Sequence, residues 1–173
     1  MRIKTLSILS LLILFLSCKK EQESNVATNK ADIENNEITE KDISKIDYIE
    51  FFIDSKAEGI TENWAEYQQL QEAITTIKKG DLSFFNDNEE TITALLKGLK
   101  KSIPKELKAP SISSRITALE TKLRKLESLS NLSTTSKKEL IATIKDFLVA
   151  FSSFNLQINK KIEFDTRKIE KPE

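Results

Sequence analysis

Residues 136–162, SKKELIATIKDFLVAFSSFNLQINKKI, decide the fold class of this 173-residue chain. Apolar side chains recur there at intervals of three and four residues: Leu140, Ile144, Phe147, Phe151, Phe154 and Ile158. This spacing places them on one face of a helix, which has about 3.6 residues per turn. Ser136, followed three residues later by Glu139, is a capping-box signature for the helix start. The stretch therefore predicts one long amphipathic helix that reaches as far as Ile162.

Three further stretches show the same helical period, and the residues at their ends are of types that commonly begin or end a helix. Two begin at capping boxes and the third at a serine N-cap: Ser55 with Glu58, Asp87 with Glu90, and Ser111. The first helix is expected to run to about Lys79 and to stop at Gly80. The second ends at Pro104, and the third ends in a polar turn at residues 130–135.

Four amphipathic helices joined by short connections favour antiparallel neighbours. The expected fold is all-α, an antiparallel up-down-up-down four-helix bundle over residues 55–164, preceded by a disordered tether. Residues 44–54 form a lead-in segment that packs on this domain, and their apolar pattern fits a helix or an extended chain equally well. Residues 165–173 form a polar tail.

Aromatic side chains are expected to fill two places in this bundle. Trp64 and Tyr67 belong to the first apolar stripe, so we expect their rings in the core and their polar atoms at its edge. Phe84 and Phe85 lie in the connection after Gly80 and are interpreted as a plug between helices.

The composition excludes several classes of function. Lysine plus arginine and aspartate plus glutamate both number 27, so the formal net charge is zero, whereas nucleic-acid-binding proteins normally carry a basic excess. The chain has no histidine, one cysteine and three glycines, which argues against the common zinc sites, Ser-His-Asp triads and glycine-rich phosphate loops. We therefore expect no nucleic-acid partner, no catalytic residue, no metal ligand, no cofactor and no enzymatic activity.

The N-terminus has the pattern of a signal peptide. Arg2 and Lys4 precede an apolar run at residues 6–16, which is shorter than the roughly 20 residues of a transmembrane helix. A charged start, a short apolar run and a small residue at the cut are typical of secretory signals. We expect residues 1–17 to be removed as a signal peptide.

The end of this run resembles the lipobox of bacterial lipoproteins. It reads Phe15-Leu16-Ser17-Cys18, with Phe15 where that family usually has leucine. The resemblance implies cleavage before Cys18, a diacylglyceryl group on its side chain and acylation of the new N-terminus. Because several acyl chains anchor a protein stably and one anchors it marginally, such a protein would be held on a membrane through Cys18.

The residues after the cysteine bear on location. Lipoproteins retained in the inner membrane of enteric bacteria usually have aspartate where this chain has Lys19, so the resemblance implies the outer membrane. Residues 19–23, KKEQE, are similar to the tether of some surface-exposed lipoproteins of Bacteroidota, and the chain resembles the short outer-membrane lipoproteins of that group. The periplasmic face and the cell surface both stay open. Residues 18–43 are polar and are interpreted as the lipidated cysteine and a flexible tether.

Two clusters of charged residues are candidate binding sites. Glu58, Glu62 and Glu66 would stack on one helix face, and a straight stripe does not converge on a cation, so we interpret them as a solvated face. A basic cluster around the end of the second helix either complements the helix C-terminus or meets an anionic partner. It comprises Lys97, Lys100, Lys101, Lys105 and Lys108.

Three amides flank the Phe-rich part of the last helix. Asn155, Gln157 and Asn159 either line a groove for an apolar ligand or partner helix, or form the exposed flank of an ordinary core stripe. The sequence thus predicts a lipid-anchored cell-envelope protein of non-catalytic interaction or structural role, with an envelope protein as its partner. The alternatives are a ligand-binding module that holds an apolar molecule in the bundle and, more remotely, a carboxylate-dependent hydrolase.

Overall fold

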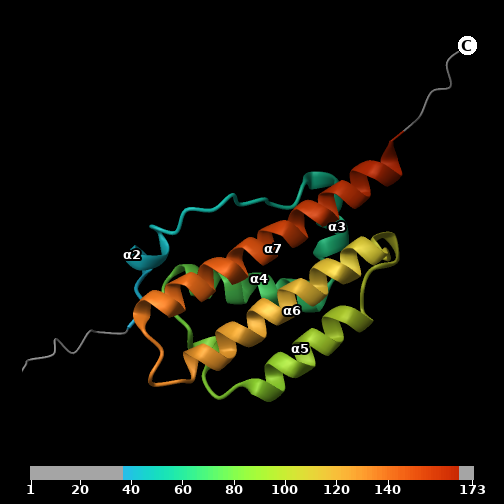
Figure 1. Ribbon diagram of the computed structural model, residues 1–173. Coiled ribbons are helices and arrows are strands. Elements are labelled where there is room, and N and C mark those ends of the chain that lie inside the picture. The colour runs from blue at the N-terminus through green and yellow to red at the C-terminus, as the bar shows by residue number, and fades with distance from the viewer. Residues whose placement is uncertain (1–36, 168–173) are drawn as a thin grey trace, which may run out of the picture. The chain divides into compact units, whose positions relative to one another are not determined.

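The computed structural model describes residues 37–167, and its regular secondary structure in that range is entirely helical, with no strand (Figure 1). The all-α fold class is confirmed. The expected signal peptide, Cys18, most of the tether and the end of the tail lie outside the described residues. The elements are α2 (Glu40–Ile43), α3 (Ser55–Thr61), α4 (Ala65–Lys78), η1 (Ser83–Phe85), α5 (Glu89–Lys101), η2 (Lys105–Leu107), α6 (Pro110–Ser130) and α7 (Lys137–Thr166).

The longest two helices, α6 and α7, lie side by side and share the most extensive helix contact (Figure 1). Their facing stripes are fully buried, with Leu119 and Leu123 on α6 and Phe147 and Phe154 on α7. Burying one such side chain contributes about 1.5–3 kcal/mol. Further contacts join α4 to α5, α5 to α6, and α3 to α7. The core is therefore built around the apolar face of α7.

The sequence pattern predicts α7 well. Ser136 is its N-cap, and its side chain accepts a hydrogen bond from the Glu139 backbone N–H at 3.2 Å. The helix continues through Thr166, so the first residues of the expected polar tail are helical. An ion pair one turn apart, Lys161 with Asp165, supports this last part of the helix.

The expected first helix over residues 55–79 is wrong, because α3 ends at Thr61 and α4 begins at Ala65. Trp64 stands between them with extended backbone angles, φ −103° and ψ 91°, and its side chain is buried. Side-chain amides bond carbonyls at the end of α3: Asn63 Nδ2 donates to Gly59 O at 2.8 Å, and Gln68 Nε2 donates to Thr61 O at 2.9 Å. The break is thus stabilised by the buried indole and by satisfied backbone groups.

Three expected caps are also wrong. Asp54, Asn88 and Ala109 occupy the N-cap positions of α3, α5 and α6, and none of their side chains makes a capping hydrogen bond. Pro110 begins α6, where its fixed φ suits the first helical turn and its missing N–H costs nothing. The expected caps at Ser55, Asp87 and Ser111 therefore do not form.

The capping box that does form lies inside the segment expected to be tether. Thr39 accepts a hydrogen bond from the Asp42 backbone N–H at 3.3 Å, and the Asp42 carboxylate accepts one from the Thr39 N–H at 3.0 Å. Ile38 and Ile43 are buried. Lys137 of α7 pairs with Asp42 at 2.8 Å. The assignment of residues 18–43 to a flexible tether is therefore wrong for its last residues, because they bury apolar surface on the fold.

Residues 46–54, which we call the strap, adopt the extended alternative. The strap connects α2 to α3 and is bonded to α7 (Figure 1). Ile46, Tyr48 and Ile53 are partly buried against the core. The aromatic rings lie where the sequence predicted: Trp64, Tyr67 and Phe85 are buried, and Phe85 contacts the ring of Phe147 at 6.4 Å between centroids. The Tyr67 hydroxyl, expected at the edge of the core, is instead buried against Asn155.

Gly80 should be required for docking of the N-terminal residues. It has a φ of +82°, and a Cβ there would lie 2.6 Å from the Thr39 carbonyl carbon. We expect Gly80→Ala to reduce the free energy of unfolding by more than about 1 kcal/mol, because of backbone strain and this clash. Gly59→Ala is the matched control. A Cβ at Gly59 meets nothing within 4 Å inside α3, so this variant should gain about 0.5–1 kcal/mol. Urea titration followed by circular dichroism measures both, and equal effects would contradict the docking described.

Docking of α2 should weaken in acid. Hydrogen bonds from Lys137 and from Thr39 lower the pKa of Asp42 to about 2. A lowered folded-state pKa means that this stabilisation is present above the unfolded value of about 4 and is lost as the pH falls toward 2. An NMR titration of the Asp42 carboxyl group should show a midpoint near 2. In Lys137→Met the midpoint should rise toward about 4, and an unchanged midpoint would show that the ion pair does not form.

Candidate functional site

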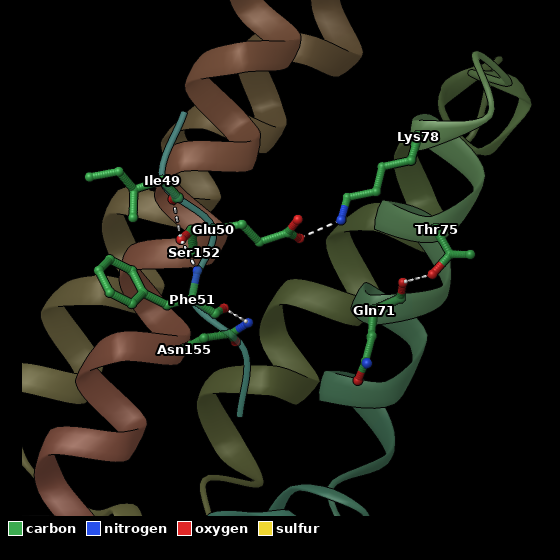
Figure 2. A network of polar contacts seen from close by, with 8 residues as sticks. All are labelled: Ile49, Glu50, Phe51, Gln71, Thr75, Lys78, Ser152 and Asn155. Atoms are coloured by element: carbon green, nitrogen blue, oxygen red, sulfur yellow. Dashed lines mark hydrogen bonds and ion pairs between the residues drawn. The ribbon is translucent and has the colours of Figure 1, made fainter. Parts of the chain in front are cut away.

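A network of polar contacts joins the strap to one flank of α7, and Figure 2 shows its central part. Ser152 accepts a hydrogen bond from the Phe51 N–H and donates one to the Ile49 carbonyl, both at 2.8 Å. Asn155 Nδ2 donates to the Phe51 carbonyl at 3.0 Å. All three bonds involve the main chain of the strap. The α7 side chains at this site therefore bind the strap through its backbone.

Asn159 continues the same network one turn further along α7. Its Nδ2 donates to the Phe52 carbonyl at 2.7 Å, and its Oδ1 accepts from the Asp54 N–H at 3.0 Å. Ser152, Asn155 and Asn159, which we call the α7 polar flank, are three and four residues apart, so they line one edge of the helix. Their edge is adjacent to the apolar stripe, which explains how one helix serves both the core and the strap.

Asn155 is a buried member of the α7 polar flank, with 5% of its surface exposed. Its Oδ1 accepts a hydrogen bond from the Tyr67 hydroxyl at 2.9 Å. Burial raises the pKa of Tyr67 well above its usual range, so the hydroxyl keeps its proton and remains a donor. Asn155 thus links α4, α7 and the strap, because its amide oxygen and its amide nitrogen each have a hydrogen-bond partner.

An open cleft of about 420 Å³ separates the strap from α4. Glu50 of the strap reaches across it to pair with Lys78, as Figure 2 shows. The Lys78 ammonium also lies 6.0 Å from the centre of the Phe52 ring. Burial, with a smaller contribution from the Glu50 charge, raises the pKa of Tyr48 to about 12. The cleft is bridged by ionic and aromatic contacts that hold the strap in place.

The acidic side chains singled out in the sequence do not form one stripe. Glu58 lies in α3 and Glu66 in the first turn of α4, and the helix break at Glu62–Trp64 separates them. Glu66 accepts a hydrogen bond from Ser102 Oγ at 2.6 Å. Within residues 37–167, no group of three or more histidine, cysteine, aspartate or glutamate side chains gathers in a way that could hold a metal ion.

The lysine cluster lies where the sequence placed it. Lys100 and Lys101 are in the last turn of α5, and the cluster is exposed. Lys100 forms an ion pair with Glu120 of α6. Position at the helix C-terminus favours the interpretation that these cations complement the helix dipole. An anionic partner for them stays a hypothesis.

The flanking amides of α7 have divided roles that the sequence analysis did not foresee. Asn155 and Asn159 bind the chain's own strap through their amide groups. Gln157 lies apart from them, beside Phe164 and Arg167. The signal that could have found the site is a serine followed by two asparagines at helical spacing beside an apolar stripe. Its partner lies 101 to 107 residues earlier in the chain, which no local pattern reveals.

Comparison of the chain with known proteins does not show which family it belongs to. Nothing matches the chain among protein-family models, curated proteins or solved structures. Over the described residues, no helix is both long enough and apolar enough to span a membrane. The strap network is therefore interpreted from its own contacts.

The Tyr67 hydroxyl should contribute measurably to stability. Tyr67→Phe removes the donor and leaves Asn155 Oδ1 buried without its partner, which costs about 1–3 kcal/mol. Tyr48→Phe is the matched control, since Tyr48 is half-buried and its neighbour Glu50 keeps the ion pair to Lys78. We expect a loss below about 1 kcal/mol for Tyr48→Phe. Chemical denaturation monitored by Trp64 fluorescence measures both, and a neutral Tyr67→Phe would show that water replaces the hydroxyl.

Proposed function

We propose that this protein is a lipid-anchored component of the cell envelope with a non-catalytic role in interaction or structural support. The observation that carries the proposal is the lone cysteine, Cys18, placed at the end of a short apolar run within a lipobox-like sequence. Acylation of Cys18 would hold the chain on the outer membrane. The absence of aspartate at position 19 supports that membrane over the inner one.

The proposed architecture is an up-down-up-down bundle of α4, α5, α6 and α7 at the end of a tether. Consecutive contacts of α4 with α5, α5 with α6, and α6 with α7 support this arrangement. Short connections between the helices also favour antiparallel neighbours. In this proposal the polar residues 19–36 connect the lipid to the folded domain.

The packing favours an interaction role over storage of an apolar ligand. A ligand-binding bundle would need a void among its aromatic side chains. Instead, the rings of Trp64, Tyr67, Phe151 and Phe154 contact one another, with centroids 5.9 Å apart for three of the pairs. Aromatic pairs at this separation are in the favourable range and leave no space between the rings. A hydrolase that uses carboxylates would need a converging pair, and no described contact favours one.

The anchor is tested by removing its cysteine. We expect Cys18→Ser to abolish incorporation of labelled palmitate and to release the protein from sedimented envelopes, because no acyl chain can be attached. Ser17→Ala is the matched control, since it keeps a small residue before the cut and should be labelled and sedimented as the natural chain is. Metabolic labelling followed by envelope fractionation gives both readouts. Continued labelling of Cys18→Ser would reject the proposal.

A further inference from the structure

The strap is bound as a peptide ligand would be. Five hydrogen bonds join its main chain to the α7 polar flank. Its Ile49 and Phe52 residues are 74% and 69% exposed, so most of their surface faces solvent, although the Phe52 ring lies 6.0 Å from the Lys78 ammonium. Recognition of an extended chain by its main-chain groups is the mode by which proteins add a strand or peptide from another chain.

The remaining strap side chains define which segment fits. Ile46, Tyr48 and Ile53 pack against the core, and Glu50 pairs with Lys78. A matching segment therefore needs three apolar residues at these positions and an acidic residue between the second and the third. Residues 46–54 satisfy the whole pattern, and a second copy of the chain presents the same segment.

The strap can leave without disrupting a helix or sheet. In the described chain, no main chain–main chain hydrogen bond involves residues 47–53, and the next one is the Ala57 N–H to the Asp54 carbonyl, at the start of α3. Residues 37–54, which we call the arm, comprise α2 and the strap. Asp54 is thus a natural hinge between the arm and the helices that follow.

We propose that the arm is exchanged between two copies of this chain, so that the strap of each copy binds the α7 polar flank of the other. Exchange of an identical element keeps every contact and changes only the chain that supplies it. The equilibrium between monomer and exchanged dimer then depends on two concentrations. One is the protein concentration, and the other is the effective concentration of the arm within its own chain, which is about millimolar for a short flexible connection.

Two complementary variants of the full chain test the exchange. The flank variant, Ser152→Ala with Asn159→Ala, keeps a natural arm but loses four of the five strap hydrogen bonds. The arm variant, Glu50→Gln with Phe51→Pro, keeps a natural flank. It loses the ion pair with Lys78 and the backbone N–H that donates a hydrogen bond to Ser152. When they are mixed, the natural arm of the first should bind the natural flank of the second. Sedimentation of differently tagged chains should show a one-to-one complex.

Matched controls carry equivalent changes outside the network. Ser153→Ala with Gln157→Ala alters α7 beside the α7 polar flank, and neither side chain makes a described hydrogen bond to the strap. Asp47→Pro removes one charge and one N–H that contact no described group of α7. Mixed controls should associate at least about tenfold more weakly than the test pair, since one hydrogen bond changes an equilibrium by roughly fivefold.

A synthetic peptide of residues 44–54, SKIDYIEFFID, provides the second measurement. An excess should dissociate the mixed complex, and the labelled peptide should bind the arm variant. If both variants are helical by circular dichroism and remain single copies when mixed, the proposal is overturned. A complex that the peptide does not dissociate would place the contact elsewhere and also overturn it. Should a double variant fail to fold, Asn159→Ala mixed with Glu50→Gln makes the same test with a smaller difference.

Discussion

The arrangement of this fold depends on one buried amide. Asn155 has a donor and an acceptor that must both be satisfied away from water, since an unpaired buried polar group costs about 1–3 kcal/mol. Tyr67 supplies the donor from α4, and the Phe51 carbonyl supplies the acceptor from the strap. Three segments distant in the sequence are thereby held in one register. Apolar packing alone is non-directional and would tolerate other registers.

The helix α7 carries two patterns with the same period. One edge presents Phe147, Phe151 and Phe154 to the core, and the adjacent edge presents the α7 polar flank to the strap. Because the flank bonds five main-chain groups between Ile49 and Asp54, a slip of the strap by one residue would break several bonds together.

The helical spacing of apolar residues correctly predicted the features that depend on one face of a single helix. The stripes of α6 and α7, the cap at Ser136 and the burial of Trp64 and Tyr67 follow from local spacing. The break between α3 and α4 could not be found this way, because Trp64 keeps the phase of the stripe while its backbone leaves the helix. Burial of Ile43 depends on tertiary contacts across the fold, so the composition of its own segment suggested tether.

The strap shows why the candidate site was the least predictable feature. Asparagine on a helix flank is ordinarily solvated, and its sequence context does not distinguish a solvated amide from one that binds a distant backbone. The binding partner is a main-chain segment, which carries no side-chain signature of its own. What makes Asn155 and Asn159 specific is the position of the strap, and that position is fixed by apolar anchors such as Ile53 and by the ion pair of Glu50 with Lys78. The site is therefore a property of the assembled fold, and a second chain that supplied the same anchors would satisfy it equally.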